Sequence, residues 1–244
     1  MEYLAAQNLA HEPISYEKPV YQISLAISGV SVIYLLSVLL TGNSWLPYTD
    51  VSLTSSDWLL AFLQCLLGTA ALHLPLALTK LTNIKLPAVL NAGYYVFIVG
   101  STVLGEMFSL YYKVSYWDSL LHFGSGIMTG MLGSILLVRH CRSKRCEHLI
   151  TPGLIAVTSL CFAIFIGVCW EIYEFAGDSL LGLNMQKSLL QDGTALVGKA
   201  ALTDTMKDLI VDMGGALVAS FASYVSLKNK RGWLYTTDEQ VCRA

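Results

Sequence analysis

The sequence predicts an all-α protein, a polytopic bundle of about six transmembrane helices. Hydrophobic residues make up 55% of the 244 residues and charged residues only 13%, and the mean hydropathy is +0.57. These values are too apolar for an ordinary soluble domain. Apolar runs long enough to cross a hydrocarbon core of about 30 Å recur along the whole chain. Acidic side chains interrupt these runs, and they do so near one predicted membrane face.

The apolar runs divide into six expected spans. They cover residues 20–40, 58–78, 86–108, 120–138, 154–175 and 209–227. The polar residues 1–19 hold three glutamates and one lysine, so they lack the basic region that begins a signal peptide. The first run is therefore expected to remain a membrane span. One transmembrane domain, 20–227, is predicted between a cytoplasmic N-terminal segment, 1–19, and a cytoplasmic tail, 228–244.

Basic residues predict the orientation. With the N-terminus inside, the inner segments hold 11 of the 15 lysine and arginine residues. The outer loops hold the other four, Lys113, Lys187, Lys199 and Lys207. Cytoplasmic loops carry an excess of positive charge, which predicts a multi-pass membrane protein with both termini in the cytoplasm.

This orientation gathers nine ionisable residues in the outer half of the membrane or at its rim. They are Glu106, Asp118, His122, Glu171, Glu174, Asp178, Asp204, Asp208 and Asp212. Ionisable side chains at membrane depth are costly and usually face a cavity, a partner or an ion. Three sets follow helical spacing: Asp118 with His122, the three acids from Glu171, and the three from Asp204. We therefore expect three helices to direct acidic faces toward one pocket.

So many carboxylates cannot stay ionised together without compensation. Either some are protonated or a cation neutralises them. Oxygen ligands with one nitrogen suit Mg²⁺, Mn²⁺ or Ca²⁺, and Zn²⁺ or iron is also compatible. The predicted metal ligands are Asp118, His122, Glu171, Glu174, Asp178, Asp204, Asp208 and Asp212. For Asp178, Asp204 and Glu106 the alternative is a helix-end residue that meets water, with Asp204 as an N-cap.

Glycines are placed where the acidic helices would meet. Gly126-x3-Gly130 with Gly133 in the fourth span, and Gly214-Gly215 in the sixth, allow close helix packing. We expect this packing to bring the acidic helices together.

The same segments resemble a known family. Their motifs are Asp118-x3-His122, Trp170-Glu171-Ile172-Tyr173-Glu174, Gln191-Asp192-Gly193 and Asp208-x3-Asp212-x2-Gly215. Over residues 110–225 the chain resembles the uncharacterised bacterial inner-membrane family that includes YjdF, and more distantly the VanZ-like proteins. Ser119, Glu174 and Asp212 stand where VanZ-like chains have Lys, Gln and Asn, which makes this site more acidic. The resemblance implies no reaction.

The residues themselves leave several function classes open. One is a metal-dependent hydrolase or transferase that acts on a lipid-linked or envelope substrate, with Glu174, Asp208 and His122 as catalytic residues. A second is a cation or proton transporter or sensor. A third is a scaffold whose acids pair with Lys199, Lys207 or Lys113.

Several absences in the sequence narrow these classes. The inner halves of the fifth and sixth spans hold no charged residue, which disfavours a path through the membrane. There is no phosphate-binding glycine loop and no nucleophile elbow. There is also no basic aromatic surface, so nucleic acid is not an expected partner. The lipid bilayer is the expected environment.

Overall fold

The computed structural model describes residues 16–44, 55–82, 86–144, 150–190, 193–230 and Leu234. Within this part of the chain, six helical stretches are long and apolar enough to cross a membrane. They are Glu17–Thr41, Asp57–Thr82, Ala88–Met107, Trp117–Cys141, Pro152–Leu181 and Lys199–Lys228. The predicted all-α class with six spans is confirmed.

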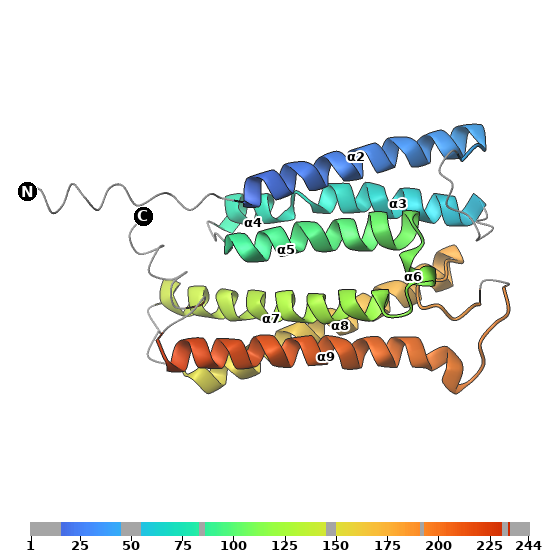
Figure 1. Ribbon diagram of the computed structural model, residues 1–244. Coiled ribbons are helices and arrows are strands. Elements are labelled where there is room, and N and C mark those ends of the chain that lie inside the picture. The colour runs from blue at the N-terminus through green and yellow to red at the C-terminus, as the bar shows by residue number, and fades with distance from the viewer. Residues whose placement is uncertain are drawn as a thin grey trace, which may run out of the picture.

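The helices form two layers (Figure 1). The first contains α2 (Glu17–Thr41), α3 (Ser55–Ala71) with α4 (Leu74–Thr82), and α5 (Ala88–Ile98) with the π-helix η2 (Val99–Met107). After the short α6 (Leu110–Lys113), the second contains α7 (Trp117–Ser143), α8 (Pro152–Leu181) and α9 (Lys199–Lys228). Helix α2 begins and α9 ends at the same end of the bundle, which we name the Lys228 end. The opposite end, where α7 begins, is the Asp118 end.

One contact between the two layers lies near the Lys228 end. Leu90 of α5 packs there with Ile135 and Val138 of α7 and with Ile155 of α8 in one buried apolar cluster. Toward the Asp118 end, α5, η2 and α6 touch α7 along one seam. The layers are otherwise apart, and the space between them contains the cavity described below.

The second predicted span is broken in its course. Helix α3 ends at Ala71, and α4 begins three residues later at Leu74. Pro75 explains the break, because a proline has no N–H and its ring clashes with the carbonyl four residues earlier, here that of Ala71. His73 lies at the break, and its Nδ1 is 2.9 Å from the hydroxyl of Tyr21.

The third predicted span changes its helical type. Its second half, Val99–Met107, is a π-helix that contains Glu106. It ends just before Ser109, which adopts the left-handed conformation with φ 57°. π-Helical turns are rare and frequently occur at functional sites. Hydrophobic periodicity does not distinguish a π-turn from an α-turn, so the sequence did not predict this change.

The sixth span begins ten residues earlier than predicted. Helix α9 starts at Lys199 after the N-cap Gly198, so Asp204 lies within the helix and is not its cap. The first turns of α9 are polar, and a hydropathy window therefore excludes them. The buried face of α9 contains Asp208, just before the predicted span, and Asp212 within it, so both acids lie inside the packed bundle.

Glycines set the spacing between α7 and α9. A Cβ atom at Gly126 would collide with the backbone oxygen of Asp212, and one at Gly215 would collide with that of Phe123. The expected close packing at these two glycines is therefore observed. Gly214 is different, since its nearest neighbour is a Phe123 ring atom at an ordinary 3.8 Å.

Candidate functional site

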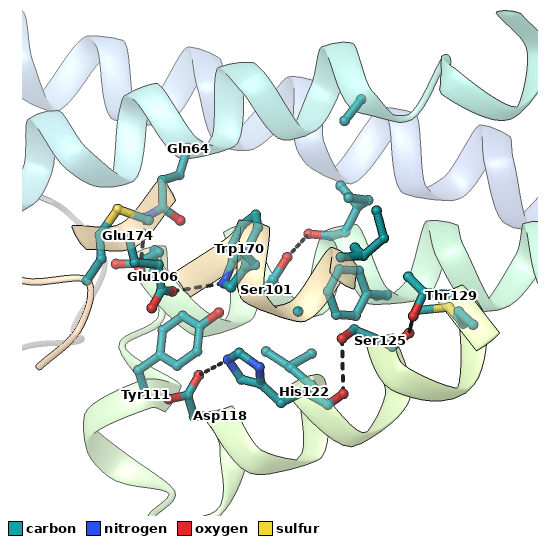
Figure 2. A pocket seen from close by; sticks show the side chains of 18 of the residues that line it. Gln64, Ser101, Glu106, Tyr111, Asp118, His122, Ser125, Thr129, Trp170 and Glu174 are labelled. Atoms are coloured by element: carbon teal, nitrogen blue, oxygen red, sulfur yellow. Dashed lines mark hydrogen bonds and ion pairs between the residues drawn. The ribbon is translucent and has the colours of Figure 1, made fainter. Parts of the chain in front are cut away.

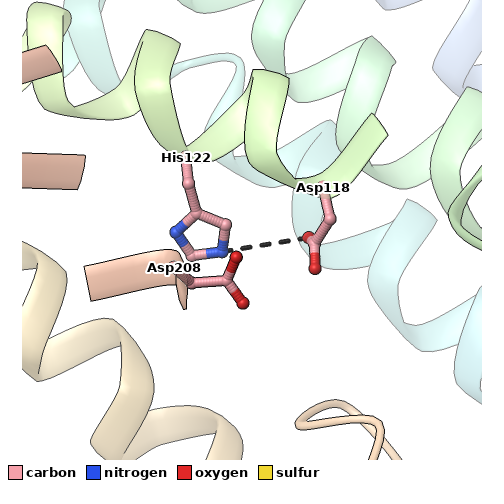
Figure 3. Close-up of side chains that lie close together, drawn as sticks. All are labelled: Asp118, His122 and Asp208. Carbon is pink, nitrogen blue, oxygen red and sulfur yellow. Dashed lines mark ion pairs between the residues drawn. The ribbon is translucent and has the colours of Figure 1, made fainter. Parts of the chain in front are cut away.

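Three predicted residues converge where α7 begins. Asp118 and His122 of α7 and Asp208 of α9 each offer a ligand atom, and these atoms all lie within 4.8 Å of one another (Figure 3). Asp208 and His122 are buried, and Asp118 is half-buried. We name this group the acidic triad. Two carboxylates and one imidazole at this separation match the donor types that a divalent cation accepts.

Asp212 orients the imidazole of this triad. His122 Nδ1 lies 3.1 Å from Asp212 Oδ2, and its Nε2 lies 3.8 Å from Asp118 Oδ1. Ser125 donates a hydrogen bond of 2.7 Å to the other oxygen of Asp212. When Nδ1 carries the proton and donates it to Asp212, Nε2 presents its lone pair toward Asp118. Metal-binding histidines are commonly held in this way by a carboxylate behind the ring.

Several carboxylate oxygens near the triad lack hydrogen-bond donors. Among the described residues, Asp208 Oδ1 and both oxygens of Glu171 are buried without a hydrogen-bond partner. Asp208 is 1% exposed and Glu171 is 5% exposed. Thr205 lies near Glu171, but not in hydrogen-bonding geometry. Buried polar atoms are nearly always satisfied in folded proteins, so these oxygens are free to accept a further hydrogen bond or to coordinate a cation.

One lysine reaches into the site from the loop between α8 and α9. Lys187 Nζ lies 2.5 Å from Asp118 Oδ2 and 4.7 Å from the centre of the Tyr111 ring. Burial tends to lower the pKa of Lys187, but the Asp118 carboxylate outweighs it and the pKa is raised. The ammonium is therefore charged at neutral pH. The backbone of Lys187 has φ 48°, a left-handed conformation that is uncommon outside glycine.

Asp178 holds the loop that contains Lys187. It accepts hydrogen bonds from the backbone N–H groups of Met185, at 2.7 Å, and Gln186, at 3.0 Å. Gln186 also donates to the Thr205 hydroxyl of α9 at 3.0 Å. Both oxygens of Asp178 are thus bound to the loop backbone, so the structure places this predicted ligand in loop anchoring. Asp178 is a positioning residue for Lys187.

The remaining predicted acids lie on three elements, α9, α8 and η2. Asp204 is half-buried on α9, one turn before Asp208. Glu174 of α8 accepts a hydrogen bond of 2.9 Å from Trp170 Nε1, and Glu106 of η2 accepts one of 3.2 Å from Gln64 Nε2. Glu106 and Glu174 line the same cavity as Asp118 and His122 of the triad (Figure 2).

That cavity has a volume of about 830 Å³ and lies between the two helical layers. At the Asp118 end it is lined by polar residues, Gln64, Glu106, Tyr111, Asp118, His122, Glu174 and Lys187. Burial, followed by the nearby acids, raises the pKa of Tyr111 well above its ordinary value. Its hydroxyl therefore stays protonated at neutral pH and can donate a hydrogen bond.

Lys187, Ser125 and Tyr111 complete the site, although the sequence did not single them out. Ser125 follows His122 by three residues, so the helical spacing that identified Asp118 could have identified it. Lys187 and Tyr111 lie outside the spans, where helical spacing gives no signal. The predicted motif residues Gln191 and Asp192 lie outside the described residues.

Comparisons with known proteins give the chain a family. A family model described as "Predicted membrane protein (DUF2238)" matches residues 29–229. A protein of Thermotoga maritima described as "Uncharacterized protein" is 31% identical over 134 residues, which cover 54% of this chain. The matched region spans 60% of the length of that relative. No solved structure matches the chain. Since the family match covers most of its length, the chain belongs to the DUF2238 family of predicted membrane proteins.

Proposed function

We propose that this protein is a membrane-embedded, metal-dependent hydrolase or transferase that acts on a lipid-linked or envelope substrate. A divalent cation is held by Asp118, His122 and Asp208. The supporting observation is the acidic triad, in which Asp212 fixes His122 and a buried Asp208 oxygen has no described hydrogen-bond partner. The positive-inside bias of the sequence supports cytoplasmic termini in the bacterial inner membrane, and hence a site at the outer face.

The donor set favours a hard cation. Asp118 and Asp208 supply oxygen and His122 supplies one nitrogen, so Mg²⁺ and Mn²⁺ are the first candidates, followed by Ca²⁺ and Zn²⁺. Glu171 has two unpartnered oxygens and interacts electrostatically with His122, which makes it a further candidate for neutralising the cation. A bound divalent cation supplies a Lewis acid that polarises a phosphoryl or carbonyl oxygen and acidifies water.

The residues around the triad have distinct proposed roles. Asp212 keeps His122 Nε2 directed at the cation position. Glu174 lines the cavity and accepts a proton from the attacking water or hydroxyl as general base. Lys187 and the Tyr111 hydroxyl stabilise negative charge that develops on the substrate. Asp178 holds the Lys187 loop over the site.

Metal analysis of the detergent-purified protein tests this proposal. We expect stoichiometric Mg²⁺, Mn²⁺, Ca²⁺ or Zn²⁺ in the wild type and its loss in Asp208→Asn, which removes one charge at nearly constant volume. Asp57→Asn is the matched control, because Asp57 lies at the same end of the bundle but outside the triad. Equal metal content in Asp208→Asn and the wild type would contradict the triad. The purified wild type could instead contain no metal, with a melting temperature that neither chelator nor added cations change. That result would favour a scaffold in which Lys187 neutralises Asp118.

A further inference from the structure

The cavity continues far beyond the acidic triad. Along α5 and η2 its lining runs from Leu86 to Glu106, which are 20 residues apart. The cavity therefore follows α5 and η2 along most of their length between the two layers, and only its Asp118 end is strongly polar.

Away from that end the lining is mainly apolar. Its residues include Leu74, Leu78, Leu90, Phe97, Met128, Leu132 and Phe162. The polar groups among them are mostly bound to the protein itself. Tyr94 donates to the Ala71 carbonyl at 2.9 Å, and Thr129 donates to the Ser125 carbonyl at 2.7 Å. This part of the cavity offers hydrocarbon contacts and few free hydrogen-bonding groups, so it does not suit a hydrated ion.

The cavity is elongated, and its volume of about 830 Å³ is spread along α5 and η2 from Leu86 to Glu106. An extended hydrocarbon chain is the slender apolar group that a membrane supplies. We name the apolar part of the cavity the chain slot.

The chain slot opens sideways toward the bilayer. One seam is closed, because α5 and η2 contact α7. On the other side, α8 packs against α7 and α9 and makes no extensive contact with α3 or α4 among the described residues. Leu74 of α4 and Trp170 of α8 both line the cavity, yet they are 60% and 46% exposed. Residues that line a cavity and are also exposed mark its opening.

We propose that the substrate is a membrane lipid with a phosphate-bearing head, which enters sideways between α3–α4 and α8. One hydrocarbon chain lies in the chain slot, and the phosphate lies at the acidic triad. This inference rests on the proposed function, because the acidic residues would repel a phosphate without the cation. With the cation held by three protein atoms, coordination positions remain for phosphate oxygens, as is common at Mg²⁺ sites. Lys187 lies beside them.

Photocrosslinking of a lipid probe tests the chain slot. The probe is phosphatidic acid with a diazirine on one acyl chain, presented to the full-length protein in phosphatidylcholine nanodiscs with Mg²⁺ or Mn²⁺. We expect crosslinks on α5 and α7 residues that line the slot, such as Phe97 and Met128. The matching diazirine diacylglycerol should label these residues less, because it lacks the phosphate.

A matched pair of substitutions controls for folding and for general lipid contact. Ala71 lines the slot, and its neighbour Ala70 is exposed and does not. Ala71→Trp should reduce slot labelling several-fold, while Ala70→Trp should leave it unchanged. Ser101→Phe blocks the slot at a second position, should Ala71→Trp fail to fold. Equal labelling in Ala71→Trp and Ala70→Trp, or crosslinks confined to exposed helix faces, would overturn the inference.

The outcome separates this inference from the proposed function. If the triad binds no cation, metal analysis finds no bound metal in the wild type. Ala71→Trp should still reduce the labelling by diacylglycerol, which tests the chain slot independently of the cation. If the slot is wrong, the two alanine variants label alike while the metal content of the wild type stays intact. Preferential labelling by diacylglycerol would keep the slot and reject the phosphate.

Discussion

Asp212 contributes to the site through His122 rather than by lining the cavity itself. It lies 3.1 Å from His122 Nδ1 and accepts the Ser125 hydroxyl, and a Cβ at Gly167 would lie 2.8 Å from its carboxylate. This surrounding leaves Asp212 little freedom. Its charge therefore acts on the imidazole, which in turn faces Asp118 and Asp208.

Replacing this carboxylate tests its role behind the ring. Asp212→Asn keeps the volume but removes the carboxylate charge that holds the His122 proton at Nδ1, and its amide can instead turn an N–H toward Nδ1. We expect cation affinity to fall by about 10–100-fold, the usual effect of losing such a partner. Ser125→Ala is the control, because it leaves the Asp212–His122 contact in place and should change affinity less. Titration of the purified variants with Mn²⁺ measures both, and equal affinities for Asp212→Asn and the wild type would contradict this role.

Lys187 provides a second test at the residue scale. Lys187→Met leaves Asp118 without its ammonium, and because the pair is only partly buried we expect a loss of about 1–3 kcal/mol in unfolding free energy without cation. A divalent cation should restore this loss, since it can neutralise Asp118 in place of Lys187. Thermal unfolding with and without Mg²⁺ measures the effect. Lys207→Met, an exposed lysine at the same end, should show neither change.

The pH dependence of the Lys187 loop follows from the same contact. The pKa of Lys187 is raised from its ordinary 10.5, so the ion pair contributes stability that is fully present below about pH 10.5 and is lost as the pH rises through the folded-state pKa. Protection of the loop against proteolysis should therefore stay constant from about pH 7 to 9 and fall only above about pH 10.5. A loss near neutral pH would show that another group controls the loop.

At the scale of elements, the crossing of α7 and α9 determines whether the triad can form. Gly126 and Gly215 let the backbones approach beside Asp212 and Phe123, and this brings His122 of one helix against Asp212 of the other. The loop between α8 and α9 then adds Lys187 to the triad. Its position depends on the anchor at Asp178.

A glycine substitution tests this crossing. Gly126→Ala places a methyl group against the Asp212 backbone, so we expect about 1–3 kcal/mol of destabilisation from overpacking together with weaker cation binding. Gly124→Ala is the matched control in the same helix, because a Cβ there would meet nothing within 4 Å. It should be neutral, or more stable by up to about 1 kcal/mol. Thermal unfolding of both variants measures the difference, and equal melting temperatures would contradict the close crossing.

The sequence predicted some elements of the fold and the site better than others. Helical spacing placed Asp118 with His122 and Asp208 with Asp212, because residues four apart share one face of a helix. It could not predict the break before Pro75, the π-helix around Glu106 or the polar start of α9, since hydropathy reports composition and not helix geometry. Helical spacing could not predict the position of Lys187 either, because a loop has no regular period that determines where a side chain points.

At the scale of the whole molecule, two helical layers enclose a slot that is polar at the Asp118 end and apolar toward the Lys228 end. A one-sided polar site joined to a hydrocarbon slot fits a lipid-processing protein better than an ion path. The face of the membrane on which the site lies then decides which lipid pool can reach it.

Reporter fusions test the orientation. Because α2 begins and α9 ends at the same end of the bundle, both termini should lie on one side, and the 11 to 4 split of basic residues predicts the cytoplasm. A fluorescent protein fused after Ala244 should fluoresce, and alkaline phosphatase at the same position should be inactive. The reverse pattern would move the acidic triad to the cytoplasmic face.

The central claim is that the triad binds a divalent cation with His122 as its nitrogen ligand, and electron paramagnetic resonance of bound Mn²⁺ tests it most directly. We predict that Mn²⁺ bound to the detergent-purified protein is coupled to a single imidazole nitrogen. This coupling should disappear in His122→Gln and persist in His73→Gln, which alters a histidine near the opposite end of the bundle. No bound Mn²⁺, or a nitrogen coupling that survives in His122→Gln, would contradict the account.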